Sequence, residues 1–434
     1  MNLSFTRHTL ANGLDVLLHE DHDCPIVAIN VWYHVGSKNE RPGHTGFAHL
    51  FEHLMFEGSA HHDHGYFQPL QGAGAALNGS TNSDRTNYWE VVPTSALELG
   101  LWMESDRMGY LLPALTDAKF SNQRAVVLNE RRQNYENRPY GLSAMAIVGA
   151  LFPPEHPYHW TTIGEVADLN AVRLDEVRAF FERYYHPANA SLTLAGDIDP
   201  DSALTLVRAY FEEIPPGQKV EPVRATATLD RDVRMLLEDR VELPRLYMAW
   251  LSAAMFAEGD AELDLAADVL ANGKTSRLYR RLVFEERIAT DVSASQNSRE
   301  IGGYLQLATT AAPGHTLGEL ERVILEEIAR LGTDGPTDDE IERGRVQAEA
   351  QFVFRLQTVG GFGGKSDQLN AYNVFLGDPA YFDRDLQRYY SVTSRSLQQA
   401  VRRYFDPARR VTLSVVPRGR TELAAPGSIP AVVS

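Results

Sequence analysis

Two histidines and a glutamate stand close together in the stretch HTGFAHLFEHLMFEG. His49 and His53 are four residues apart, and Glu52 directly precedes the second histidine. In an α-helix, which turns about 100° per residue, the two imidazoles project within about 40° of each other and can bind one metal ion. Glu52 projects about 60° to the side of His49, where a carboxylate can accept a proton from a water molecule at the metal without being a ligand. The alternative is a pair of hydrogen-bonded core histidines beside a salt-bridged glutamate.

Glu130 is the candidate for the third protein ligand that a zinc site needs. It lies in the stretch TDAKFSNQRAVVLNERRQNYENRPYG, which reads as a long helix. The predicted inner face of this helix carries Phe120, Val126 and Val127. Glu130 follows them at helical spacing and falls on the same apolar stripe, whereas Glu136 falls about 120° away, toward solvent.

A carboxylate on an apolar face costs several kcal/mol unless it meets a positive partner. A metal ion held by His49 and His53 would be such a partner for Glu130. The alternative is a salt bridge from Glu130 to Arg124 or Arg131. We prefer the metal interpretation.

The elements around these residues predict an α+β fold. Thr45 is expected to cap the helix with the histidines, and Gly58 is expected to end it. The segments IVAINVWYHVGS and NYWEVVP read as strands before and after this helix, and the dipeptide Asn12-Gly13 predicts a hairpin near the N-terminus. This order favours a mostly antiparallel or mixed sheet with helices packed on one face.

A repeat divides the chain into two similar halves. LDEVRAFFERYYHPANASLTLAG and SLQQAVRRYFDPARRVTLSVVP share an amphipathic helix, an aromatic pair, a proline and a strand, so that Val177 corresponds to Leu397 and Pro187 to Pro407. The proline-rich segment between the halves reads as a linker. We therefore predict a zinc-binding catalytic half at 1–213, a linker at 214–231 and a homologous half without metal at 232–434.

Composition narrows the classes of function. The chain has 434 residues, a formal net charge of −17, one cysteine and 14 histidines, of which only His315 follows the linker. The acidic balance argues against nucleic-acid binding, and the single cysteine excludes a disulfide framework. No apolar run reaches the roughly 18 residues of a membrane span, so we expect no membrane partner. A cytoplasmic location is expected, or a periplasmic one if a signal peptide has been removed.

The residues carry a resemblance to a known family. The segment His49-Leu50-Phe51-Glu52-His53, followed by Glu130, resembles the HxxEH zinc signature of the pitrilysin/insulinase family of inverted-zincin metallopeptidases, in its short two-domain, processing-peptidase-like type. The stretches LNGSTNSDRTNYWEVVP, FPPEHPY and KTSRLYRRL are similar to the family pattern as well. The resemblance covers nearly the whole chain.

The resemblance implies a zinc metalloendopeptidase with one Zn2+ per chain. His49, His53 and Glu130 would hold the zinc, and Glu52 would be the general base that deprotonates a zinc-activated water. The stretch ALNGSTNSDRTNYW resembles the family's substrate-binding edge strand, so that Asn78, Gly79, Ser80 and Thr81 would bind an extended peptide through backbone hydrogen bonds. An ordinary surface hairpin is the alternative for this stretch.

Two features depart from the family pattern, one single residue and one pair of residues. Gln123 stands where many relatives have a second glutamate, seven residues before the ligand Glu130, and could still form hydrogen bonds near the site. Active relatives commonly carry an arginine and a tyrosine seven residues apart in the half without metal. This chain has Val283 and Thr290 at the matching positions. A site without those donors loses stabilisation of the transition state.

The missing pair predicts a partner. The simplest solution is a heterodimer with a homologous subunit that has the Arg/Tyr pair and lacks HxxEH, and a homodimer is the fallback. The alternative function is a non-catalytic structural or assembly subunit of a processing-peptidase-like complex. A zinc hydrolase that acts on another bond is a further alternative. The segments TVGGFGGKSDQ and SAHHDHG are expected to be loops.

Overall fold

The first half of the chain forms a mixed six-stranded sheet. The structure is a computed structural model that describes residues 3–433. The strands lie in the order β1-β2-β6-β3-β5-β4. Their bounds are β1 Thr6–Thr9, β2 Asp15–Glu20, β3 Ile26–Tyr33, β4 Ala76–Thr81, β5 Thr86–Pro93 and β6 Ala190–Gly196. β2 runs parallel to β6, and the other neighbouring pairs are antiparallel. The predicted hairpin is present, with Gly13 at a φ of 88° between β1 and β2.

The second half repeats this topology in five of its six strands, and its outermost strand, β12, differs from β1 because it follows the other strands in sequence and runs parallel to its neighbour. Its sheet has the order β12-β7-β11-β8-β10-β9. The bounds are β7 Val233–Asp239, β8 Arg245–Ser252, β9 Ala289–Asn297, β10 Gly303–Ala311, β11 Val411–Pro417 and β12 Ile429–Pro430. β7 runs parallel to β11, as β2 does to β6. Helix α14 begins 220 residues after α7 begins and ends 220 residues after α7 ends. The predicted α+β class with two similar halves is confirmed.

The helices lie between and around these strands. In the first half they are α1 Phe47–Leu54, α2 Phe67–Gly72, α3 Leu97–Ala114, α4 Asp117–Arg131, α5 Ser143–Leu151, α6 Val166–Ala171, α7 Leu174–Tyr184 and α8 Pro200–Phe211. In the second half they are α9 Asp260–Ala271, α10 Leu317–Asp334, α11 Asp338–Arg355, α12 Lys365–Leu376, α13 Phe382–Ser391 and α14 Ser394–Tyr404. A π-helical turn, Arg132–Glu136, follows α4.

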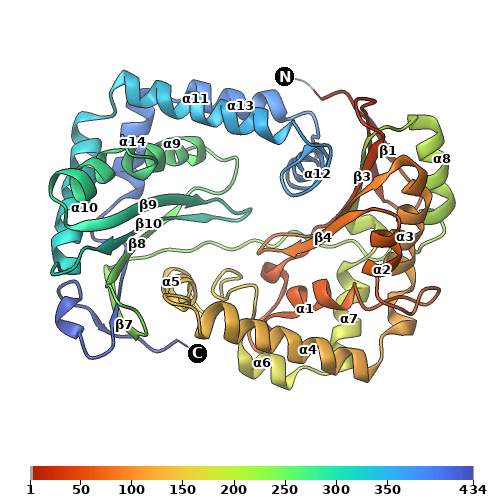
Figure 1. Ribbon diagram of the computed structural model, residues 1–434, viewed down its shortest axis with the longest axis horizontal. Coiled ribbons are helices and arrows are strands. Elements are labelled where there is room, and N and C mark those ends of the chain that lie inside the picture. The colour runs from red at the N-terminus through yellow and green to blue at the C-terminus, as the bar shows by residue number, and fades with distance from the viewer. Residues whose placement is uncertain (1–2, 434) are drawn as a thin grey trace. The chain divides into compact units, whose positions relative to one another are not determined.

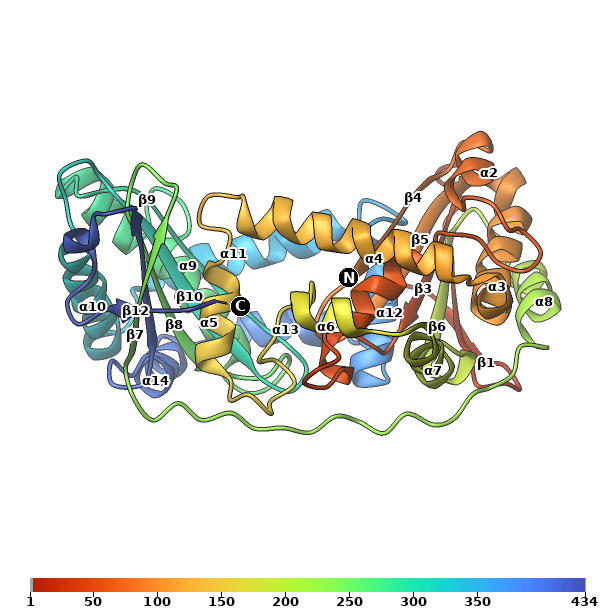
Figure 2. The ribbon, with the colours of Figure 1, turned by 90° about the horizontal axis from the view of Figure 1, so that it is seen from below.

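The chain folds into two compact units that exchange helices. The first unit contains the residues up to Asn129, Thr162–Val223 and Ala350–Arg384, and the second contains the remaining residues. Helix α12 of the second half therefore packs on β3 and β6 of the first sheet (Figure 1). Helix α5 of the first half packs on β8 and β11 of the second sheet (Figure 2). The predicted halves 1–213 and 232–434 describe the repeat in the sequence, and they stay a prediction as domain boundaries.

Alternation along β3 explains how α12 is held. Val27, Ile29 and Val31 are buried on one face of the sheet, and Asn30 and Trp32, which are also buried, point to the opposite face, toward α12. Trp32 Nε1 donates to Asp367 Oδ1 over 2.8 Å, and Asn370 Nδ2 donates to the backbone oxygen of Asn30 over 2.8 Å. The contact of α12 with the sheet is therefore polar, with its buried groups hydrogen-bonded to each other.

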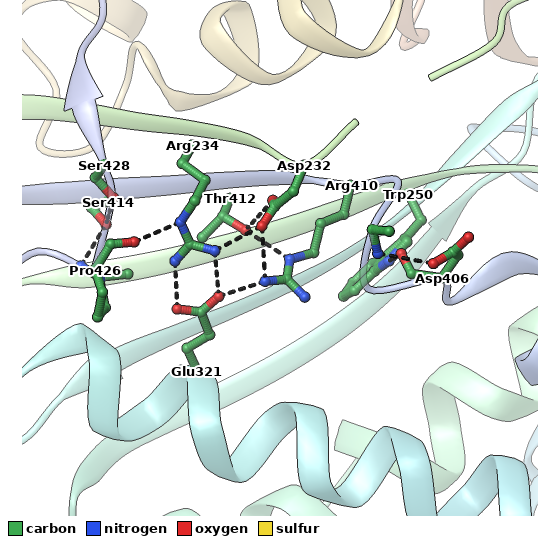
Figure 3. A network of polar contacts seen from close by, with 12 residues as sticks. Asp232, Arg234, Trp250, Glu321, Asp406, Arg410, Thr412, Ser414, Pro426 and Ser428 are labelled. Carbon is green, nitrogen blue, oxygen red and sulfur yellow. Dashed lines mark hydrogen bonds and ion pairs between the residues drawn. The ribbon is translucent and has the colours of Figure 1, made fainter. Parts of the chain in front are cut away.

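A charged network joins the strands and helices of the second unit. Glu321 of α10 accepts hydrogen bonds from Arg234 of β7 and from Arg410, which precedes β11 (Figure 3). Asp232 adds a second carboxylate to both arginines. Hydrogen bonds to Glu321 and Asp232 raise the pKa of the Arg234 guanidinium. Two carboxylates and two guanidiniums balance here, which is the condition under which buried charges are tolerated.

Residues 215–230 contain neither helix nor strand. Among residues 3–433, every helix is too short or too polar to cross a lipid bilayer.

Candidate metal centre

Helix α1 carries the histidine pair, but its ends differ from the prediction. It begins at Phe47 and ends at Leu54, so Thr45 is not its N-cap and Gly58 lies beyond its end. The carboxylate of Glu40 accepts hydrogen bonds from the backbone N–H groups of Gly46 and Ala48, at 2.9 and 2.8 Å. Glu40 thus satisfies the free N–H groups that Thr45 was expected to satisfy.

Thr45 has a different role. Its hydroxyl donates to Asp168 Oδ2 over 2.7 Å and accepts from the backbone N–H of Glu165 over 2.8 Å. The two segments approach so closely that a Cβ on Gly164 would lie 2.5 Å from the Cα of Gly46. Thr45 therefore ties the start of α1 to α6.

The apolar face of α1 fixes the direction of its histidines. Leu50, Phe51 and Leu54 are fully buried, and the ring of Phe51 lies 5.2 Å from that of Tyr185. His49 and His53 are half-buried on the other side, with ring centroids 4.8 Å apart. The predicted common face of the two imidazoles is confirmed.

Helix α4 brings Glu130 to the same place. α4 belongs to the first unit as far as Asn129, and Glu130 is the next residue of the same helix. Phe120 and Val127 are buried as predicted, whereas Val126 is 41% exposed, so its assignment to the inner face was wrong. The buried face of α4 is therefore centred on Val127 and excludes Val126. Glu130, three residues after Val127, lies on this same face. Arg131, one of the alternative partners of Glu130, contacts Glu136 at 3.3 Å.

The three predicted ligands converge. One nitrogen each of His49 and His53 and one oxygen of Glu130 lie within 4.8 Å of one another. Ligands of a tetrahedral zinc at bond lengths of about 2.0 Å are about 3.3 Å apart, so small side-chain rotations would close the set. Two imidazoles and a carboxylate are also the ligand set of many catalytic zinc sites. The residues fit a zinc ion.

Gln123 contacts one of these ligands. Its Oε1 lies 3.2 Å from His53 Nδ1, and its Nε2 donates to Glu57 Oε1. With Gln123 Oε1 as the acceptor, His53 donates its Nδ1–H, so its Nε2 is the nitrogen that can bind a metal. Such outer partners fix the tautomer and the orientation of a ligating histidine. Gln123 is therefore placed as predicted, and Glu57 is an addition that the sequence did not indicate.

Replacing Gln123 by Leu is expected to weaken zinc binding about 10- to 100-fold, because His53 loses the acceptor that orients it. Zinc affinity would be measured by competition with a chelator of known affinity. Gln123→Glu is the matched control, because it keeps an acceptor at this position and should bind zinc at least as tightly as the unaltered chain. Equal affinity in all three chains would contradict this role.

Glu52 lies among buried aromatic residues beside the pair. Burial raises the pKa of Tyr88 and of Tyr185 well above the usual value, and the charge of Glu52 adds to both shifts. Glu52 also interacts electrostatically with Arg85. Burial lowers the pKa of the Arg85 guanidinium, and the negative charges of Asp367 and Glu52 partly oppose this lowering. A half-buried carboxylate next to the metal ligands is the placement that a general base needs.

The predicted substrate strand is an edge strand. β4 pairs with β5 on one side and is last in the sheet order, so its other edge has no strand partner among residues 3–433. Asn78 and Ser80 point to one face, and Gly79 and Thr81 to the other. Gly79 faces α1, because a Cβ there would lie 3.1 Å from the ring of Phe56.

Arg85 was missed as a positioning residue for this strand. Its Nη1 donates to Ser80 O over 2.8 Å and to Ser80 Oγ over 2.6 Å. A basic residue just after a predicted edge strand was the only sequence signal for it. Arg85 links the C-terminal end of β4 to the surroundings of Glu52.

The other residues considered from the sequence lie outside this cluster of ligands. Val283 packs against the core of the second unit, and the hydroxyl of Thr290 donates to Asp291. His61 hydrogen-bonds Asp106. Within residues 3–433, neither His61 nor its neighbours His62 and His64 join a cluster of metal-ligand type.

Strand β5 carries a buried carboxyl. Glu90 of β5 is 1% exposed and lies near Glu104 and Arg107, while Arg107 stacks on the rings of Tyr66 and Tyr88 at 4.1 and 4.2 Å. Burial, and then the charge of Glu104, raise the pKa of Glu90 well above its ordinary 4.5. Glu90 is therefore protonated in the folded state at a pH where the unfolded chain ionises it.

This pKa predicts a pH dependence of stability. The folded state binds the proton of Glu90 more tightly than the unfolded state, so its contribution is complete below pH 4.5 and is lost as the pH rises from there toward the folded pKa. Within that window, the free energy of unfolding of the unaltered chain should fall by about 1.4 kcal/mol per pH unit because of Glu90. The Glu90→Gln chain should not show this fall, because an amide does not titrate. The free energy of unfolding in urea would be compared across pH. Parallel curves for the two chains would contradict the prediction.

Comparison with known proteins places the chain. The family model described as "Insulinase (Peptidase family M16)" matches residues 15–148, and that described as "Peptidase M16 inactive domain" matches residues 171–347. The zinc protease PqqE of Helicobacter pylori is 27% identical over 81% of this chain and 80% of that protein. The uncharacterized zinc protease YmxG of Bacillus subtilis is 24% identical over 81% of this chain and 84% of that protein.

Solved structures share the fold. A protease from Helicobacter pylori has a TM-score of 0.88 at 24% identity and covers 96% of this chain and 100% of that one. A peptidase M16 inactive domain from Pseudomonas fluorescens has a TM-score of 0.85 at 17% identity, covering 99% of this chain and 100% of that one. The first of the two family matches lies within the first half, and the second begins in the first half at residue 171 and extends into the second half as far as residue 347. The chain belongs to the insulinase family, peptidase family M16.

Proposed function

We propose that this chain is the zinc-bearing subunit of a metalloendopeptidase that cleaves extended peptides. The observation that carries the proposal is the convergence of His49, His53 and Glu130 within 4.8 Å, with Glu52 on the same helix as the histidines. The donor set also accepts other divalent metals. The names of the relatives, which are zinc proteases, favour zinc.

A zinc ion bound there would act as a Lewis acid on the peptide carbonyl and make water acidic enough to react. The residues of the chain supply the remaining functions. His49, His53 and Glu130 orient the site, and Gln123 fixes the ring of His53. Glu52 takes a proton from the attacking water and delivers it to the leaving amine. Two roles for one carboxylate require that it lie within hydrogen-bond reach of both the attacking water and the leaving nitrogen.

The free edge of β4 provides the means to bind a peptide. A substrate that adds to Asn78–Thr81 as a further strand is held by its backbone, so affinity does not depend on one sequence. α1 packs against β4, so such a peptide would pass the metal ligands. Arg85 holds Ser80 on the strand.

The active assembly is proposed to be a heterodimer. Val283 and Thr290 occupy the positions at which active relatives commonly have an arginine and a tyrosine. Val283 has no donor, and the hydroxyl of Thr290 donates to Asp291, so neither residue replaces the pair that would stabilise an oxyanion. A homologous subunit that has the pair and lacks HxxEH would supply it, and a homodimer is the fallback. The match of residues 171–347 to an inactive domain also favours a second candidate, a structural subunit of such a complex.

Cleavage of a mixed peptide set separates the candidates. The zinc-loaded chain would be assayed alone and after co-expression with the related subunit, with and without a chelator, and the products identified by mass spectrometry. Activity that appears only when the related subunit is present, and that stops when the chelator is added, supports the proposal. Full activity of the monomer would contradict the heterodimer, and zinc without cleavage in any mixture would favour the structural role.

A further inference from the structure

A cavity of about 610 Å³ lies in the first unit, on the face of the sheet opposite α1. It is bounded by the β2–β3 loop, by β4 and β5, and by the segment 356–361 that leads to α12. Trp89, Val91, Leu356 and Val359 give it a largely apolar lining. Its volume is within the range of sites that bind small molecules or side chains.

The glycine-rich segment 358–364 is seated on the sheet by close contact. A Cβ on Gly360 would lie 2.5 Å from Val91 Cγ2 and 2.7 Å from Ala28 Cβ, so only glycine allows this approach. The ring of Phe362 meets that of Trp89 edge to face at 5.5 Å. Lys365, at the start of α12, forms an ion pair with Asp21. The wall of the cavity is therefore built by tertiary packing.

The cavity is continuous with the edge strand. Ala76, the first residue of β4, lies opposite Val91 on β5, and both residues line the cavity. Asn78 and Ser80 share this face with Ala76, while Gly79 points toward Phe56 after α1. A peptide added to the edge of β4 would direct alternate side chains toward α1 and toward the cavity. Ala76 is about 10 Å along the strand from Gly79.

One polar atom in the lining has no acceptor. The Nε1 atom of Trp89 is buried and has no hydrogen-bond partner among residues 3–433. Buried indole N–H groups normally find an acceptor. A peptide bound in the cavity carries carbonyl oxygens, and one of them would reach this nitrogen only if the side chains that cover it move.

We infer that this cavity is a specificity subsite, which binds a large apolar side chain of the extended peptide several residues away from the cleaved bond. The inference rests on the proposed binding of peptides along β4. Trp89 and Val91, which line the cavity, contact the side chain. Selectivity thus comes from a position remote from the zinc ligands.

Peptide binding to the zinc-loaded Glu52→Gln chain, followed by fluorescence anisotropy, tests the inference. The labelled peptides differ by replacement of Ala with Phe at one position at a time. We expect about 10- to 100-fold tighter binding when Phe occupies one particular position. Cys24, the one cysteine of the chain, is exposed and lines the cavity, so a bulky maleimide can fill it.

The maleimide adduct should abolish the preference for Phe and leave the binding of the all-Ala peptide in place. A small methylthio adduct on Cys24 is the matched control and should preserve the preference. Treated and untreated Cys24→Ser chains should bind alike. Peptide binding without a preference at any position, or a preference that survives the bulky adduct, would overturn the subsite and leave the proposed function standing. Failure of every peptide to bind would overturn both.

Discussion

Replacing Glu52 by Gln is expected to lower kcat/KM for peptide cleavage by about a hundred- to ten-thousandfold while zinc remains bound. The amide keeps the size of the side chain but cannot take a proton from water, and general base catalysis contributes rate factors of about this size. Glu52 is not one of the three converging ligands, so metal content should be unchanged.

The matched control for this variant is Glu182→Gln. Glu182 is an exposed glutamate on α7 and lies outside the site, so this change should leave cleavage unaltered. Metal analysis and steady-state kinetics would be done on the same preparations of the active assembly. Loss of zinc from the Glu52→Gln chain would show that Glu52 is a ligand, and undiminished turnover would show that another group is the base.

Replacing Glu130 by Gln is expected to remove both zinc and activity. A neutral amide is a much weaker ligand than a carboxylate, and two imidazoles alone leave the site with too few ligands. The loss of affinity should exceed the roughly 10- to 100-fold expected for an outer partner such as Gln123. Zinc at a hundred times its dissociation constant stabilises the folded chain by about 2.7 kcal/mol, so the variant should also lose a zinc-dependent rise in Tm.

Glu136→Gln is the matched control for Glu130. Glu136 follows α4 in the π-helical turn and contacts Arg131 with a 40% exposed side chain. This change should keep the zinc content and the zinc-dependent rise in Tm. The assignment of the third ligand would be wrong if the Glu130→Gln chain bound zinc as the unaltered chain does and the Glu136→Gln chain lost zinc.

The helix faces that carry the candidate ligands could be predicted, because the face on which a residue lies depends on local periodicity. His49 and His53 share a face through the geometry of one helix, and Glu130 shares a face with the buried Val127. The wrong assignment of Val126 concerns one residue at the border of the buried face. A stripe one residue wider or narrower fits the same sequence, and only the contacts of α4 decide which residues it includes.

The features that could not be predicted depend on contacts between distant segments. Glu40 caps α1 from outside the helix, and the expected cap, Thr45, instead contacts Asp168. The packing of α12 on the first sheet joins Asp367 to Trp32, and the periodicity of either segment does not show this pairing. Glu57 reaches Gln123 only because α1 ends before it. Such partners are set by tertiary structure, which a single sequence does not reveal.

Anomalous scattering at the zinc absorption edge, from crystals of the zinc-loaded chain, tests the central claim most directly. We expect one strong peak within bonding distance of one atom each of His49, His53 and Glu130. Glu52 should lie near the peak without being bound to the metal. No peak at this place, or a peak at His61, His62 and His64 instead, would contradict the assignment of the metal centre.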